Sequence, residues 1–242
     1  MAQDEQGSLE AHEELGFLID STYPLLKLFR EKTPGTHKHA QAVVSMVESV
    51  SLSLGLDIML MKVCATYHDI GKICNPIYFT ENQMEGENPH DTLDPWVSFQ
   101  IISRHVADTV NILVNNHEFP RRVIEIVSQH HGDGVVKYFL DKAGKNVDPN
   151  TYRYYCSKPA SIESAVLMIC DHVEAKSRSR FQTGKLNPGE VIESTINNLI
   201  DDGQLDEVIM KLGALKKIKI ALAKELEGSY QKRVQYPEDD KK

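Results

Sequence analysis

The sequence of 242 residues predicts an all-α protein. Along most of the chain, apolar residues recur at steps of three and four, the spacing of one face of an α-helix. No stretch alternates apolar and polar residues over the length of a strand. The chain is long enough to bury a sizeable core, and no segment stands out as a boundary between domains. We therefore expect one helical domain.

Residues that begin and end helices mark the first half of the chain in order. Thr36 is expected to cap a helix that ends at Gly55, and Asp57 to cap the next helix, which runs toward His68. Residues 74–94 are dense in Asn, Pro, Gly and Glu and have no sustained period, so they predict a long irregular loop.

Further start signals follow in the second half. Asp94 is expected to cap a helix whose first residue is proline, and Pro120 and Ser161 each to begin another. Pro188 begins a further helix, and residues 205–228 are expected to supply two more.

The ends of the chain differ in character from its middle. Residues 1–20 and 231–242 are polar, so we expect a flexible N-terminal segment and a charged C-terminal tail. Residues 21–230 would form the single domain, with residues 188–228 as its C-terminal helices.

Composition excludes several classes of protein. With 27 Lys and Arg against 35 Asp and Glu, the net charge is −8, which disfavours binding to nucleic acid polymers. The 4 cysteines include no CxxC pair, which fits a reducing cytoplasm. No apolar run approaches the roughly 20 residues of a transmembrane helix, and the acidic N-terminus lacks the apolar region of a signal peptide. We predict a cytoplasmic protein that is a monomer or weak homodimer.

Histidine and aspartate residues are the candidate metal ligands of this sequence. A lone histidine is more often structural than a ligand, but the 10 histidines here include members of two adjacent pairs, His68 with Asp69 and His130 with His131. Each pair stands at the predicted end of a helix, where Gly71 and Gly132 would let the chain leave the helix. Imidazole and carboxylate ligands suit zinc, iron, manganese or nickel, and ligand type alone does not choose among them.

The spacing of these residues resembles a known family. A His, a His-Asp pair about thirty residues later and a distant Asp are the signature of HD-domain metallophosphohydrolases. The stretches PGTHKHA, YHDIGK, ENQMEGENPHD, ISRHV, QHHG and CDHVEAKSRS resemble, over residues 21–185, the cytoplasmic HD domain of seven-transmembrane HD receptors. Members of that family are cyclic di-AMP phosphodiesterases. The resemblance implies an HD-domain helical bundle.

The resemblance also implies a set of metal ligands. His39, His68, Asp69 and Asp171 match the four HD ligands, and His105, His130 and His131 match the histidines that hold a second metal. Asp69 would bridge two divalent transition metal ions, iron or manganese, with zinc as the alternative. Every matching position carries a ligand-type residue, which disfavours a non-catalytic copy.

Two metals that share a carboxylate predict phosphate ester hydrolysis. They lower the pKa of a bridging water, and the resulting hydroxide attacks phosphorus in line. The resemblance implies that cyclic di-AMP is opened to pApA. Another cyclic dinucleotide or mononucleotides are the alternative substrates, and a nucleotide-binding signalling module without turnover is the alternative of another class.

Two basic residues are candidates for contacts with phosphate. Lys72, just after Asp69, either neutralises the phosphate or is a solvated lysine at a helix end. Arg178 shares a helix face with Asp171 and Glu174, so it either reaches the phosphate or pairs with Glu174 at the surface.

Three further residues are candidates for contacts with the base. Tyr154 matches an aromatic position of the family and could stack on an adenine. Asn82 and His90 lie in the loop that would line the site, where they would orient ligands or contact a base. The alternative for both is that they only stabilise the loop itself.

Overall fold

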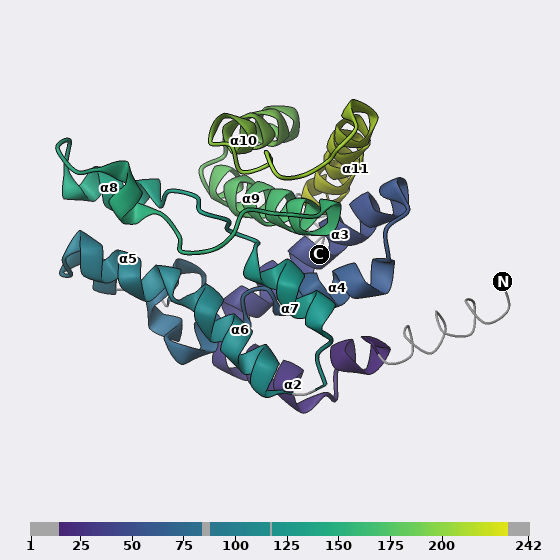
Figure 1. Ribbon diagram of the computed structural model, residues 1–242, viewed down its shortest axis with the longest axis horizontal. Helices are drawn as coiled ribbons and strands as arrows, with labels where there is room; N and C mark the ends of the chain where they lie inside the picture. Colours follow the sequence, from purple (N-terminus) through teal and green to yellow (C-terminus); the bar gives the residue numbers. More distant parts are fainter. Residues whose placement is uncertain (1–14, 84–87, 117, 232–242) are drawn as a thin grey trace, which may run out of the picture.

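Helices make up the regular structure of the computed structural model, which describes residues 15–83, 88–116 and 118–231 (Figure 1). Within these ranges there is no β-strand, only an isolated bridge between Val135 and Arg153, so the predicted all-α class is confirmed. With η for short 3-10 helices, the elements are η1 (Phe17–Ile19), α2 (Pro24–Lys32), α3 (Pro34–Leu54), α4 (Ile58–Tyr67), η2 (Ile70–Cys74), η3 (Pro76–Tyr78), η4 (Thr80–Asn82), η5 (Pro89–Asp91), α5 (Pro95–Ser103), α6 (His105–Asn115), α7 (Arg121–Ser128), α8 (Lys137–Ala143), η6 (Pro149–Tyr152), α9 (Ile162–Gln182), α10 (Pro188–Asp201) and α11 (Leu212–Gln231).

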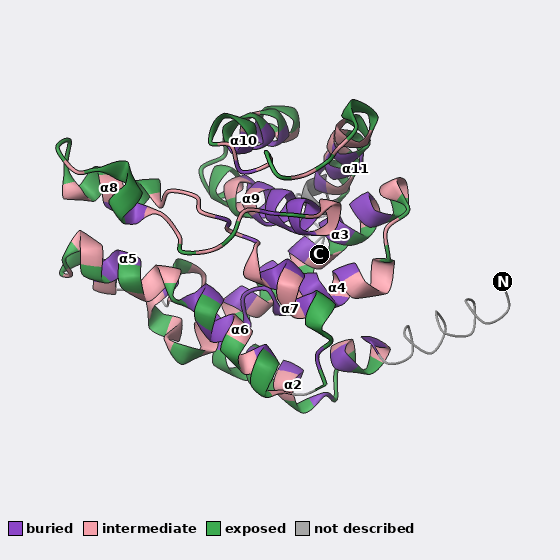
Figure 2. Ribbon diagram, in the orientation of Figure 1, coloured by how far each residue is buried: buried purple, intermediate pink, exposed green. Residues whose placement is uncertain are grey.

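The long helix α9 forms the centre of the main hydrophobic core. Every residue from Ser164 to Asp171 is buried, so this stretch is covered on all sides (Figure 2). Helices α3, α4, α7 and α10 pack against α9, and α11 packs against α3 and α10. A helix buried all round carries apolar residues on every face, which is why this stretch lacks an amphipathic pattern. None of the helices in the described ranges is long and apolar enough to cross a bilayer.

The last part of the N-terminal segment expected to be flexible packs against the main core. Leu15 and Leu18 are buried, and the hydroxyl of Tyr67 donates a hydrogen bond to the carbonyl of Leu18. For residues 15–20 the prediction is therefore corrected, because two apolar side chains anchor them. Residues 1–14 and the tail from 232 to 242 lie outside the described residues.

The C-terminal helices share the main core. Ile196 of α10 and Ile218 of α11 belong to the same buried cluster as the residues of α3 and α9. The prediction of two helices over residues 205–228 is wrong, because only α11 forms there and the chain before it is irregular. The preceding Gln204 is buried and bonded to Asp133, which draws this segment toward the loop after α7 instead of into a helix.

Most helix boundaries lie where the sequence predicts them. The side chains of Asp57, Asp94 and Ser161 cap the N-termini of α4, α5 and α9, and Gly55 ends α3 with a φ of 73°. Thr36 does not cap α3. The helix begins two residues earlier, at a proline whose fixed φ suits the first helical position.

A smaller cluster of apolar side chains lies apart from the main core. It joins Phe99 of α5, Phe139 of α8 and Tyr152 of η6. Trp96 stacks on Phe99 with ring centroids 5.3 Å apart. Helices α5 and α8 extend together to one side of the bundle (Figure 1), and we call them, with η6, the α5–α8 lobe.

Gly71 allows η2 to cross α6 at close range. A Cβ at this position would lie 2.1 Å from the backbone oxygen of His105 and 2.5 Å from the backbone nitrogen of Thr109. The Gly71 N–H donates to Oγ1 of Thr109 over 2.9 Å, and this hydroxyl donates to the carbonyl of His68 over 3.2 Å. This contact joins the two segments that carry His68 and His105.

We expect Gly71→Ala to lower the free energy of unfolding by about 2–3 kcal/mol, because the atoms that the new methyl meets belong to helix backbone and cannot move aside. Urea unfolding of the metal-free protein, followed by circular dichroism, measures this. Gly213→Ala on α11 is the matched control, since no atom lies within 4 Å of its Cβ position. Equal stability of the two variants would contradict the expectation.

Candidate metal centre and active site

Asp69 lies where the backbone leaves helix α4. The helix ends at Tyr67, His68 keeps helical angles, and Asp69 has φ −112° and ψ 11°. Inside a regular helix, neighbouring side chains diverge by about 100°, and this change of backbone lets His68 and Asp69 face the same space. The predicted role of Gly71 is corrected, because the chain leaves the helix before it. Gly132 does have the left-handed conformation expected of it, with φ 53°.

Four histidine rings from four segments surround the carboxylate of Asp69. Nε2 of His105 and of His130 lie 3.1 and 3.7 Å from Oδ1. Nε2 of His68 and of His39 lie 3.3 and 3.7 Å from Oδ2. Each oxygen therefore faces two imidazole nitrogens, the arrangement that a carboxylate shared by two cations requires.

Asp171 of α9 closes the cluster from the opposite side. Its Oδ1 lies 3.0 Å from Nε2 of His39 and 3.6 Å from Nε2 of His68. Its Oδ2 lies 3.8 Å from Nδ1 of His131, at the end of the turn that follows α7. All the side chains predicted as metal ligands thus meet in one buried cluster.

The rings of His68, His105 and His130 are oriented in the same way. In each, Nδ1 donates a hydrogen bond to the backbone carbonyl three residues earlier, over 2.8, 2.7 and 2.6 Å. This bond leaves Nε2 as the position that a proton or a metal can take. Nε2 of His68 and Oδ1 of Asp69 are buried without a hydrogen bond partner among the described residues. A divalent cation would satisfy such atoms, so the donor set fits a pair of metal ions.

Carboxylates set the charge of two of these histidines. Burial alone lowers the pKa of His39, but hydrogen bonds to Asp171 and Glu174 outweigh it and raise the pKa to about 9. Burial likewise lowers the pKa of His68, and the charge of Asp69 and the contact with Asp171 raise it to about 10. Both rings therefore carry a proton at neutral pH in the metal-free protein.

Lys72 faces the cluster and not the solvent. Its ammonium lies 2.7 Å from Oδ2 of Asp69 and 2.9 Å from Oε1 of Glu81, and 4.9 Å above the ring of Phe79. Burial raises the pKa of Glu81, but the Lys72 charge outweighs it and lowers that pKa to about 2. The alternative of a solvated lysine is wrong, because a buried carboxylate holds the ammonium on each side.

Glu174 supports His39 from behind. Its Oε2 lies 2.5 Å from Nδ1 of His39 and 3.3 Å from Nε of Arg178, and the side chain is buried. The pair of Arg178 with Glu174 therefore forms between a partly exposed guanidinium and a buried carboxylate, and Arg178 also lines the cavity beside the cluster. The sequence places Glu174 on the helix face of Asp171 and Arg178 but does not reveal its bond to His39. Its spacing of three residues from Asp171 was the signal that it faces the same ligands.

Tyr154 covers one metal ligand. Its ring stacks on that of His131 with centroids 4.5 Å apart and an interplanar angle of 19°. The ring also lines the cavity.

Arg153 and two residues after α10, Asp202 and Gln204, hold the turn that carries His131, and no sequence pattern pointed to the latter two. Arg153 donates to the carboxylate of Asp202 over 3.1 Å and to the backbone carbonyl of Asp133 over 2.8 Å. Gln204 donates to the carboxylate of Asp133 over 2.7 Å. A Cβ on Gly132 would lie 2.2 Å from Oε1 of Gln204, so a larger residue there would displace this side chain. The bond between Gln204 and Asp133 joins positions 71 residues apart, which no local pattern reveals.

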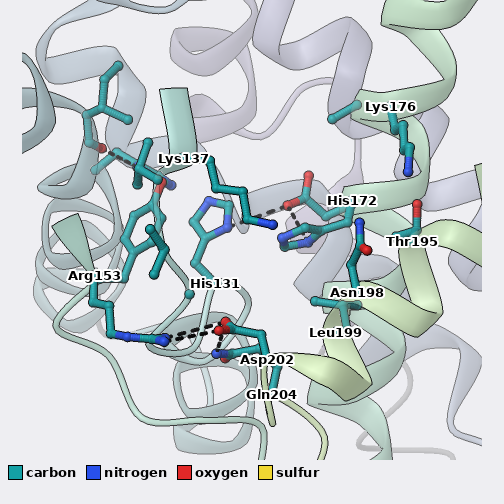
Figure 3. Close-up of a pocket in the computed structure, with 18 of the residues that line it drawn as sticks. His131, Lys137, Arg153, His172, Lys176, Thr195, Asn198, Leu199, Asp202 and Gln204 are labelled. Carbon is teal, nitrogen blue, oxygen red and sulfur yellow. Dashed lines mark hydrogen bonds and ion pairs between the residues drawn. The ribbon is translucent and has the colours of Figure 1, made fainter. Parts of the chain in front are cut away.

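A cavity of about 900 Å³ opens beside the cluster (Figure 3). His131 and Asp171 of the cluster are among its lining residues. One wall comes from the α5–α8 lobe, including Leu140, and the other from α9 and α10, including Leu199. The volume is in the range of sites for small molecules.

Asn82 and His90 do not line this cavity. The amide of Asn82 donates to Oγ1 of Thr36 over 2.8 Å and accepts from the N–H of Thr36 over 3.0 Å. Nε2 of His90 donates to the carbonyl of Tyr78 over 2.9 Å, and its ring packs edge-on against Phe139. Both side chains therefore stabilise the loop before α5, and their contact with substrate stays a prediction.

Comparison with known proteins identifies the family. The model of the HD domain family matches residues 36–176, more than half of the chain. The chain belongs to the HD-domain family.

Two curated relatives match most of the chain. The chain is 39% identical over 226 residues to "Cyclic-di-AMP phosphodiesterase PgpH" of Listeria monocytogenes serotype 1/2a (strain 10403S), covering 92% of this chain and 31% of that protein. It is 36% identical over 228 residues to PgpH of Bacillus subtilis (strain 168), covering 93% and 32%. It therefore spans about a third of the length of these curated relatives.

Two crystal structures of the HD domain of L. monocytogenes PgpH match the fold. One has a TM-score of 0.80 at 39% identity and covers 86% of this chain and 100% of that one. The other, in complex with cyclic di-AMP, has a TM-score of 0.80 at 38% identity and covers 88% and 100%.

We expect Glu174→Gln to weaken metal binding at His39 by about 10- to 100-fold, because the ring loses the charged group that orients it. Metal content after dialysis at a series of free Mn²⁺ concentrations measures this. Glu190→Gln, at an exposed position on α10, is the matched control and should bind as the unmodified protein does. Unchanged affinity in the Glu174 variant would show that the buried carboxylate does not support the ligand.

Metal binding at pH 7 should release about two protons, because His39 and His68, with pKa values raised to about 9 and 10, must lose theirs to become ligands. His130 and His131 add none, since burial lowers their pKa and leaves them neutral. Apparent affinity should rise about 100-fold between pH 7 and 8, where both protons compete, and level off above pH 10. Calorimetry in buffers of different ionisation enthalpy counts the protons, and a count of zero would contradict the assignment.

Proposed function

We propose that this chain is a dinuclear metal-dependent phosphodiesterase that hydrolyses cyclic di-AMP to pApA. The observation that carries the proposal is the buried carboxylate of Asp69, each oxygen of which faces two histidine Nε2 atoms. The printed activity of the PgpH relatives supports the reaction, and the complex of their HD domain with cyclic di-AMP supports the ligand.

Two divalent ions, iron or manganese with zinc as the alternative, would share Asp69. The residues around its Oδ2 are His39, His68 and Asp171, and those around its Oδ1 are His105, His130 and His131. When bound, such a pair supplies a hydroxide nucleophile at neutral pH and offsets the negative charge that develops on phosphoryl oxygens.

The chain's own cations would position the phosphate that is cleaved. Lys72 directs its ammonium to Asp69 and Glu81, which leaves one of its three protons for a phosphate oxygen. Arg178 uses Nε for Glu174, which leaves the two outer guanidinium nitrogens for the substrate. Tyr154, which lines the cavity, would stack on an adenine. The partner is thus a small cyclic dinucleotide. The cytoplasmic location and the monomer or weak dimer stay predictions from the sequence.

Turnover of cyclic di-AMP with added Mn²⁺, measured beside cyclic di-GMP and nucleoside monophosphates, tests this function. We expect pApA from cyclic di-AMP, and no turnover in Asp69→Ala, because the shared ligand is lost. Asp91→Ala removes an exposed carboxylate from η5 and should retain activity. Release of phosphate from nucleoside monophosphates alone would indicate that mononucleotides are the substrates. If the metal-loaded protein turns over none of these substrates, a nucleotide-binding signalling module is favoured instead.

A further inference from the structure

The cavity extends well beyond the metal cluster. Along α9 its lining includes Asp171, His172, Ala175 and Lys176. At a rise of about 1.5 Å per residue, Lys176 lies roughly 7.5 Å along the helix axis from Asp171. A ligand held by its phosphate at the metal cluster therefore has room to place a second group beside Lys176.

Two basic side chains in this cavity have no carboxylate partner. Of the basic residues that line it, three are paired with a carboxylate, namely Lys72 with Asp69 and Glu81, Arg153 with Asp202, and Arg178 with Glu174. Lys137 and Lys176 make no ion pair with any described residue, although Asp141 lies one turn after Lys137 on α8. Both lysines are therefore free to bind an anion.

The two lysines enter the cavity from different walls. Figure 3 shows Lys137, from the start of α8, reaching toward His131 and His172, and Lys176, from α9, on the other side of His172. Lys176 donates one proton to Oγ of Ser194 over 2.7 Å, which leaves two donors for a ligand. Burial and the charge of Arg180 lower the pKa of Lys176, the charge of Glu190 opposes this without forming an ion pair, and Lys137 adds a smaller lowering. An anion between the lysines would relieve this repulsion.

Neutral donors stand beside Lys176 on α10. Thr195 and Asn198 line the same part of the cavity (Figure 3). Oγ1 of Thr195 is buried and has no hydrogen bond partner among the described residues, and the side chain is 4% exposed. A buried hydroxyl without a partner is costly, and a ligand oxygen would satisfy it.

We propose that Lys137 and Lys176, with Thr195, form a second anion subsite that binds the uncleaved phosphate of a cyclic dinucleotide. This inference rests on the proposed function, because it takes the cleaved phosphate to lie at the metal cluster. The subsite gives the cavity two phosphate-binding ends, which matches a ring that contains two phosphodiesters. A mononucleotide occupies only one of them.

The test compares substrates with one and two phosphates. We expect Lys176→Gln and Lys137→Gln each to raise KM for cyclic di-AMP roughly tenfold, the loss of a hydrogen bond to a charged group. KM for bis(p-nitrophenyl) phosphate, which has a single phosphate, should change far less. Lys145→Gln, an exposed lysine of the α5–α8 lobe that does not line the cavity, controls for the general loss of positive charge. Equal changes for both substrates, or none for cyclic di-AMP, would overturn the subsite.

Inhibition of bis(p-nitrophenyl) phosphate hydrolysis separates failure of the subsite from failure of the proposed function. If the unmodified protein cleaves this ester but not cyclic di-AMP, the proposed function fails. The subsite is then judged by the inhibition constants of pApA and AMP. The subsite is supported if pApA inhibits the unmodified protein more tightly than AMP does and this difference is lost in the two lysine variants. The same ratio of the two inhibition constants in all variants overturns it.

Discussion

The structure depends on keeping the carboxylate of Asp69 buried and charged. A buried carboxylate without compensation would be protonated or would destabilise the fold. Here burial raises its pKa, and Lys72 together with the surrounding histidines holds it well below the usual range. The histidines come from four segments, so the fold must bring α3, α6 and the residues that follow α4 and α7 to one point. In the metal-free protein, protons on His39 and His68 provide part of the positive charge that metal ions would supply.

This requirement explains several features at some distance from Asp69. The glycine at position 71 lets η2 approach α6, which brings His105 beside His68. Glu174 fixes one ring from behind, and backbone carbonyls fix three others. The end of α10 holds the turn of His131 through Gln204. The helices that do not supply metal ligands therefore still contribute to the site, because they orient the groups that do.

The basic side chains that line the cavity form two groups, those paired with a carboxylate and those without such a partner. Lys72 and Arg178 are each paired with a carboxylate, which fixes their positions before a ligand arrives. Lys137 of α8, which reaches toward His131, and Lys176, farther along α9, have no such partner. Cations that ion pairs hold in fixed positions suit the phosphate that is cleaved, because a small displacement of a catalytic group reduces the rate. Unpaired lysines suit binding, since an incoming anion does not have to displace an ion pair.

The sequence by itself determined the helical class and most helix boundaries, and it predicted the residues that meet around Asp69. These features depend on residues that are close together in the sequence, so the sequence alone reveals them. They are the helix periodicity, caps such as Asp57 and the adjacent pairs that end in Asp69 and His131. Only the tertiary structure decided what the remaining candidates contact. Asn82 and His90 lie in the expected loop but bond to the protein itself, and Gln204 supports the site from far along the chain. The physical reason is that a side chain's partner depends on which distant segments pack beside it, and that packing minimises the free energy of the whole core.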